Sequence, residues 1–176
     1  TCVVLDVTHT GVQLTMLDYF DTTGVAAIDY FVSDDYHSPA DSPQRFTETL
    51  IRLPTIRLCY EPVDIAPPVR ELPALRNGFV TFGSFNRRQK VTPEVVALWS
   101  RVLHAVPDAR LLLKGAYFDR PEVQERIVHE FADAGVSPER LEFRGHSAHR
   151  AALEQYGDVD IALDTFPYHG TTTTCE

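Results

Sequence analysis

The sequence predicts an α/β fold over residues 78–176, with a parallel sheet covered by helices on both faces. Two observations lead to this prediction. Short apolar runs alternate with longer segments whose apolar residues recur at helical spacing, and the connections between them are short. Such alternation forms parallel sheets, because each helix carries the chain back to the start of the next strand. A different region, residues 1–66, and a Pro-rich linker, residues 67–77, come first.

The first strand of the sheet is expected over residues 79–85. A helix then begins at Thr92-Pro93-Glu94, because Thr is a good N-cap residue, Pro suits the first helical position and Glu suits the first turn. The apolar face of this helix is formed by Val95, Val96, Leu98, Trp99, Val102 and Leu103.

The later elements repeat this alternation. Further strands are expected over residues 110–114, 141–143 and 159–163, with helices over residues 121–134 and 148–156. Gly135 would end the helix before it, since glycine is favoured just after a helix C-terminus. Parallel sheets of this kind bind ligands at the carboxyl ends of their strands, so the loops that follow the strands are the candidate site.

Residues 1–66 contain short apolar runs over residues 2–7, 12–19 and 26–32, separated by turn residues, which predicts strands. A short helix is expected from Ser42-Pro43 to about Leu50, because Pro is favoured at the first helical position. Repeated Pro residues then form a stiff connector that we place at the domain boundary.

The composition narrows the possible partners. A net charge of −9 and a sequence pI of about 5.2 argue against a nucleic-acid partner, which needs a basic face. A small anionic ligand is compatible with this charge, since one lysine and one helix end can hold a diphosphate. The cysteines Cys2, Cys59 and Cys175 have no metal-type spacing, which favours a reducing, cytoplasmic location. No apolar run is long enough for a membrane span, so no membrane partner is expected.

Residues 159–176 are the most informative segment: a buried strand, a turn rich in helix breakers, and the first turn of a helix. Such a turn aims free backbone N–H groups at one point, where phosphate binds. Glu176 could accept hydrogen bonds from ribose hydroxyls, as acidic residues do in dinucleotide folds. Simple helix capping is the alternative interpretation. The candidate phosphate-binding residues are Gly170, Thr171, Thr172 and Thr173. The helix that should follow is missing, so we expect the chain to be part of a longer one.

Two other loops lie at the predicted ligand edge. The loop after the first strand carries Asn86, Arg87 and Lys90, and a lysine ammonium suits a phosphate oxygen. A solvated basic loop is the alternative. The loop after the third strand carries His146 and His149, whose imidazoles could stack on or hydrogen-bond a base; solvated loop histidines are again the alternative.

No metal site is predicted. Asp158-Val159-Asp160 matches the D-x-D pattern of metal-dependent sugar transferases, but it enters a strand at the end opposite the ligand edge. The Asp34–His37 segment suggests a metal in the same way, and we do not assign one there either. The i, i+3 spacing of His146 and His149 could serve a metal, but no third ligand is nearby in the sequence. There is no P-loop and no G-x-G-x-x-G turn.

Several segments together resemble the O-linked N-acetylglucosamine transferase family, in its bacterial Spindly-type branch (glycosyltransferase family 41). The resemblance covers nearly all of residues 78–176, and a weaker match runs through residues 11–34. The matching segments are residues 79–86, 90–95, 98–99, 105–114, 159–168 and 170–176.

The resemblance implies a two-lobed, metal-independent, inverting GT-B glycosyltransferase. Residues 78–176 would be a Rossmann-like nucleotide-sugar-binding lobe and residues 1–66 the tail of the acceptor-side lobe. The reaction implied moves N-acetylglucosamine from UDP-GlcNAc to Ser or Thr hydroxyls of a protein acceptor, without a cofactor. Carried over by position, Lys90 would be catalytic and stabilise the leaving diphosphate. The other implied ligand residues are Thr171, Thr172 and Thr173 for the phosphates, Glu176 for the ribose, and Ser147 and His149 for the base.

The chain departs from the family pattern at two places. The base-stacking His of some relatives falls at Ala152, and the family's Trp-Leu-Gly-Tyr-Pro-Gly-Thr falls on residues 16–22, which lack the Pro and both Gly. Three alternatives stay open. A fucosyltransferase that uses GDP-fucose is one, since plant Spindly relatives share the motifs. A non-catalytic nucleotide-binding module, which the change at residues 16–22 favours, and a scaffold without a ligand are the others. We expect this segment alone to be inactive.

Overall fold

The computed structural model describes residues 11–16 and 19–176. The chain forms two compact units, Thr1–Tyr60 and Glu61–Glu176. The division falls earlier than the boundary expected after residue 66, so the Pro-rich stretch belongs to the second unit. The strand expected over residues 2–7 lies outside the described residues, as do residues 17–18 of the run expected over residues 12–19.

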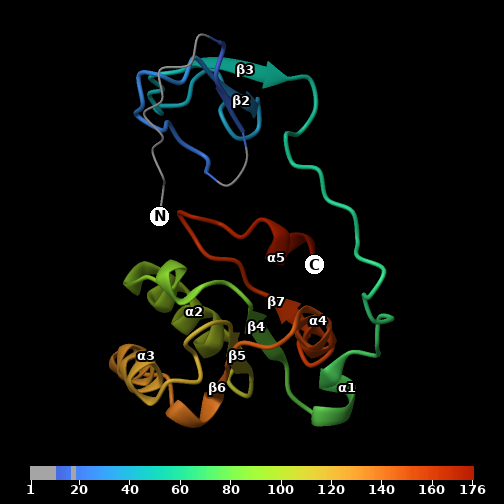
Figure 1. The fold of residues 1–176 in the computed structure, drawn as a ribbon. Coiled ribbons are helices and arrows are strands. Elements are labelled where there is room, and N and C mark those ends of the chain that lie inside the picture. Colours follow the sequence, from blue (N-terminus) through green and yellow to red (C-terminus); the bar gives the residue numbers. More distant parts are fainter. Residues whose placement is uncertain (1–10, 17–18) are drawn as a thin grey trace. The chain divides into compact units, whose positions relative to one another are not determined.

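The first unit contains a parallel three-stranded sheet in the order β1-β2-β3 (Figure 1). Its strands are β1 (Leu14–Thr15), β2 (Tyr30–Asp34) and β3 (Thr49–Leu53). The Phe31 side chain of the central strand is almost fully buried, as expected where both neighbours cover a strand.

The helix expected over residues 42–50 is wrong. Residues 43–47 have no regular structure, and β3 begins at Thr49, whose N–H donates to the Asp29 carbonyl at 2.8 Å. Glu48 is fixed just before the strand, because its carboxylate accepts hydrogen bonds from Thr22 and Thr23. These partners are distant in sequence, so local helix signals were outweighed by contacts that no short window contains.

The α/β prediction for the second unit is confirmed. Its four parallel strands are β4 (Thr81–Ser84), β5 (Arg110–Lys114), β6 (Leu141–Arg144) and β7 (Ile161–Ala162). Its α-helices are α1 (Pro73–Asn77), α2 (Pro93–Ala105), α3 (Pro121–Asp133), α4 (His149–Tyr156) and α5 (Thr172–Cys175). Short 3-10 helices cover Arg88–Lys90 and Pro138–Arg140. The observed strands β4 and β7 are shorter than expected.

The strand order β6-β5-β4-β7 creates a switch point between β4 and β7. The chain moves outward through α2 and α3, then returns through α4 to the other side of β4. Right-handed crossovers therefore put α2 and α3 on one face of the sheet and α4 on the opposite face, as Figure 1 shows. Ligands of doubly wound sheets bind at such a point, outside the carboxyl ends of the strands.

A side-chain cap explains where α2 begins. The Thr92 hydroxyl accepts a hydrogen bond from the Val95 N–H, which starts α2 as the sequence predicts.

The core of the unit is formed by the apolar faces of α2 and α3 against β5, and Trp99 is its largest buried side chain. A Cβ on Gly83 would lie 2.4 Å from Val159, so only glycine lets the two chain segments approach this closely.

The linker prediction missed α1, which begins at Pro73 and ends before Gly78 with φ of +75°. Asp160 holds its start, because this carboxylate accepts hydrogen bonds from the Ala74 and Thr81 N–H groups, each at 2.8 Å. Asp158 accepts a hydrogen bond from Arg144 at 2.7 Å. The D-x-D carboxylates are thus engaged in structural contacts.

No helix in the described ranges is long and apolar enough to cross a membrane.

Candidate functional site

Asp164, two residues beyond β7, organises the carboxyl edge of the sheet. Its Oδ1 accepts hydrogen bonds from the Thr165 N–H at 2.7 Å, the Gly170 N–H at 2.8 Å and the Asn86 side chain at 3.1 Å. Its Oδ2 accepts one from the Thr174 hydroxyl at 3.0 Å. One carboxylate therefore ties together the loops that follow β4 and β7 and the start of α5.

These hydrogen bonds keep Asp164 ionised. Burial alone would raise the pKa of this carboxyl, but donation from the Gly170 and Thr165 N–H groups, and then from Thr174 and Asn86, outweighs burial and lowers the pKa. The edge thus carries a fixed negative charge that holds loop structure. Asp164 was not predicted as a site residue. Its place directly after a predicted strand was the feature of the sequence that could have indicated a role at the ligand edge.

Lys90 contacts the loop between β7 and α5, which Asp164 also organises. Its ammonium donates to the His169 carbonyl at 2.6 Å and lies 4.5 Å from the centre of the Tyr168 ring. Burial lowers the pKa of Lys90; the Asp164 charge opposes this effect and Arg87 adds to it. The structure therefore brings Lys90 next to the segment that leads into Gly170, as sheet topology predicted.

A pocket of about 310 Å³ opens beside this edge. It collects residues from the ends of β4 and β5, the loop after β6, helix α4 and the C-terminal segment. Its walls are Phe85, Lys114, Gly115, His146, Ser147, Ala148, His149, Ala152, Tyr156, Thr173 and Glu176. Four of the predicted ligand residues, Ser147, His149, Thr173 and Glu176, therefore share one cavity although they lie far apart in sequence.

Two of these residues are in direct contact. His149 Nε2 lies 2.8 Å from Glu176 Oε1, and the Glu176 side chain is only 11% exposed. The predicted base and ribose contacts are thus adjacent on the cavity wall. Ala152 lies on the same wall.

The sequence analysis missed the aromatic part of the wall. Phe85 and Tyr156 stack with ring centres 3.8 Å apart and an interplanar angle of 12°. The Tyr156 hydroxyl donates to the Thr173 carbonyl at 2.9 Å. This tyrosine therefore links helix α4 to the phosphate-candidate segment, a contact that the sequence pattern does not reveal.

The other predicted residues lie around the cavity without lining it. Asn86 is buried and joins the Asp164 hydrogen bonds, whereas Arg87 is exposed on the same loop. Gly170 has no room for a side chain, because a Cβ would lie 2.3 Å from Thr174 Oγ1. Thr171 and Thr172 stand at the start of α5, and the Thr171 side chain makes no capping hydrogen bond.

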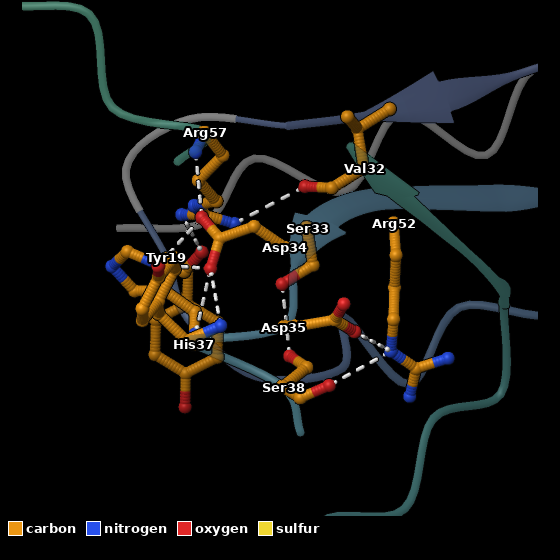
Figure 2. Close-up of polar contacts among 10 residues, drawn as sticks. Tyr19, Val32, Ser33, Asp34, Asp35, His37, Ser38, Arg52 and Arg57 are labelled. Atoms are coloured by element: carbon orange, nitrogen blue, oxygen red, sulfur yellow. Dashed lines mark hydrogen bonds and ion pairs between the residues drawn. The ribbon is translucent and has the colours of Figure 1, made fainter. Parts of the chain in front are cut away.

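The Asp34–His37 segment forms a closed cluster in the first unit (Figure 2). Asp34 is 1% exposed and accepts hydrogen bonds from the His37 N–H at 2.8 Å and the Arg57 N–H at 2.6 Å. The His37 ring nitrogen Nδ1 lies 2.8 Å from the same carboxylate. Within residues 11–16 and 19–176, no group of three or more His, Cys, Asp or Glu side chains could hold a metal ion.

The chain was compared with known proteins. No protein-family model matches it. It is 42% identical over 167 residues to the probable UDP-N-acetylglucosamine–peptide N-acetylglucosaminyltransferase SPINDLY of Oryza sativa subsp. japonica. It is 44% identical over 170 residues to the SPINDLY protein of Petunia hybrida. Both matches cover 94% of this chain and 18% of the relative.

A solved structure agrees with these sequence matches. A lysine-to-methionine mutant of the O-GlcNAc transferase of Thermobaculum terrenum superposes with a TM-score of 0.77 at 39% identity, over 92% of this chain and 30% of the solved one. The chain belongs to the O-linked N-acetylglucosamine transferase family. The family resemblance predicted from sequence is therefore confirmed, as is the fold. The chain spans less than a third of either kind of relative, so it corresponds to part of such a protein.

Proposed function

We propose that this chain forms the nucleotide-sugar-binding part of a protein O-GlcNAc transferase, which moves N-acetylglucosamine from UDP-GlcNAc to Ser or Thr hydroxyls of an acceptor protein. The observation that carries this proposal is the pocket of about 310 Å³ at the sheet edge, which unites Ser147, His149, Thr173 and Glu176. The names of the relatives support the choice of donor and of a peptide acceptor.

The proposed contacts follow the order of groups in the donor. Ser147 and His149 contact the base, and Glu176 contacts the ribose beside them. The hydroxyls and N–H groups of Thr171, Thr172 and Thr173 hold the diphosphate. When the donor binds, the Lys90 ammonium donates its hydrogen bond to a phosphate oxygen in place of the His169 carbonyl.

The proposed reaction is a direct displacement. The acceptor hydroxyl attacks the anomeric carbon and releases its proton to solvent, the bond to the diphosphate breaks, and UDP leaves with inversion at that carbon. The charge that develops on the leaving diphosphate is stabilised by the Lys90 ammonium, and such electrostatic stabilisation is usually the largest catalytic contribution. No metal takes part in this proposal.

The test is a calorimetric titration of the full-length protein with UDP and with GDP. Lys90→Ala should weaken UDP binding by at least about tenfold, since a charge-assisted hydrogen bond contributes roughly 1.5–3 kcal/mol. Arg101→Ala is the matched control, because it removes one positive charge from an exposed position on α2. Melting temperatures should stay alike in all three proteins.

The alternatives give different results. Preferential binding of GDP would replace the proposed donor with a guanine nucleotide sugar. UDP binding without transfer to any peptide, in a protein that keeps Lys90, would indicate a non-catalytic module. Absence of binding to either nucleotide in a cooperatively folded protein would overturn the donor site itself.

A further inference from the structure

The chain contains only two lysines, Lys90 and Lys114, and both stand at the ligand edge of the same sheet. Lys90 lies in the loop after β4, whereas Lys114 is the last residue of the neighbouring strand β5. The proposed function uses the first lysine and leaves the second without a role.

Lys114 is buried although it carries a charged group. Its residue surface is 3% exposed, and its ammonium donates to the Gly145 carbonyl at 2.9 Å. An ammonium has three N–H donors and no acceptor, so one carbonyl does not use its full capacity. Burial lowers the pKa of Lys114, and the nearby Arg144 charge lowers it further. Retaining a lysine here is costly unless another acceptor joins it.

The pocket offers space for a ligand atom that accepts a hydrogen bond from Lys114. Lys114 lines the cavity together with Ser147, whose Oγ is buried and has no hydrogen-bond partner among the described residues. Two residues with spare donor capacity therefore line one cavity, and Phe85 supplies an apolar part of its wall. A planar ring that carries an oxygen acceptor on its edge satisfies all three features, whereas a hydrocarbon would leave both donors unsatisfied.

We propose that Lys114 is a specificity-determining residue that donates a hydrogen bond to the O4 carbonyl of the donor's uracil ring. This inference rests on the proposed function and extends it, because it states how the site selects the base. Cytosine differs at this position by an amino group, which is a donor and would meet the Lys114 ammonium unfavourably. The site should therefore reject cytidine nucleotides through this one side chain.

The experiment compares UDP and CDP as ligands of the full-length protein by calorimetric titration. The wild type should bind UDP at least about tenfold more tightly than CDP, the factor expected for one charge-assisted hydrogen bond. Lys114→Met keeps the length of the side chain and removes the donor. It should weaken UDP binding by about that factor and bring the ratio of the two affinities close to one. Arg101→Met, on the exposed face of α2, is the control and should keep the wild-type ratio.

Each other result overturns the proposal. Equal weakening of UDP and CDP in Lys114→Met would place the ammonium on the phosphates or on the ribose. An unchanged affinity ratio, with Lys90-dependent UDP binding intact, would make Lys114 a structural residue and leave the donor site standing. If the wild type binds neither nucleotide, or binds only GDP, both the uracil contact and the UDP assignment fail. A melting temperature equal to the wild-type value separates these results from misfolding.

Discussion

Asp34 and Asp164 use the same chemistry in the two units, yet to different ends. Each stands at or just beyond the carboxyl end of a parallel strand, and each accepts several hydrogen bonds from the loop that follows. Asp34 is almost fully buried and surrounded by its own unit, with Arg57 against it (Figure 2). Asp164 is half-buried, and the loop that it organises leads into the wall of an open pocket.

In both units an aspartate organises the loop that follows a strand, and the surroundings of the aspartate decide whether this point is structural or functional. Arg57 is 2% exposed, and its guanidinium donates to the Val32 and Tyr19 carbonyls and lies 4.7 Å from the Phe20 ring centre. The first cluster is thus closed by protein groups. The second leaves space at the sheet edge, where a ligand can complete it.

The largest expected effect is on the stability of the closed cluster. Asp34→Ala should reduce the local unfolding free energy of residues 30–57 by about 3 kcal/mol, because the buried backbone N–H groups of Arg57 and His37 lose their acceptor. Amide hydrogen exchange in the full-length protein measures this directly. Nucleotide affinity in the second unit should stay unchanged. A loss of affinity would contradict a purely structural role of Asp34 within the first unit.

The matching change at the open edge should act on binding. Asp164→Asn keeps the shape of the side chain and removes its charge, so the loop between β7 and α5 should be held less firmly. We expect UDP to bind about tenfold more weakly, a cost of about 1.4 kcal/mol. Calorimetry measures the affinity, and hydrogen exchange of residues 30–57 is the control. Unchanged affinity would show that Asp164 is as purely structural as Asp34.

Acid should distinguish the units further. Burial alone would raise the pKa of Asp34, but hydrogen bonds from Arg57 and His37 outweigh burial and lower this pKa from 3.8 to about 2. Burial alone would likewise raise the pKa of Glu48, but hydrogen bonds from Thr23 and Thr22 lower it from 4.5 to about 2. Since both values are depressed on folding, their stabilisation is complete above about pH 4.5 and is lost as pH falls toward 2.

The expected loss over this window is on the order of 1 kcal/mol for Asp34 after allowance for solvent screening. Hydrogen exchange or circular dichroism at pH 5 and pH 3 measures this loss of stability. Asp34→Asn should flatten the pH dependence of the first unit, and an unaltered slope would refute the assignment to this carboxyl.

The smallest effect is expected at the aromatic wall. Tyr156→Phe preserves the stack on Phe85 and removes the hydrogen bond to the Thr173 carbonyl. The local free energy should fall by about 0.5 kcal/mol, because a neutral hydrogen bond contributes little net stability where water can replace it. Exchange of the amides in α5 measures this. Tyr156→Ala, which also removes the stack, should have a clearly larger effect.

Local chemistry was sufficient to predict most of the second unit. The Thr92-Pro93-Glu94 helix start is confirmed by α2, and the strand expected over residues 110–114 matches β5. These signals are local, because caps and short apolar runs act within a few residues. The expected helix over residues 42–50 failed because Glu48 is fixed by Thr22 and Thr23, which lie outside any local window.

The alternation of strands and helices, the loops that follow the strands and the family can all be read from the sequence. The strand order β6-β5-β4-β7 comes from packing, and it sets which loops meet at the switch point. Lys114, Tyr156 and Asp164 joined the site for this reason. Their roles depend on burial and on partners far along the chain, and these are properties that packing creates.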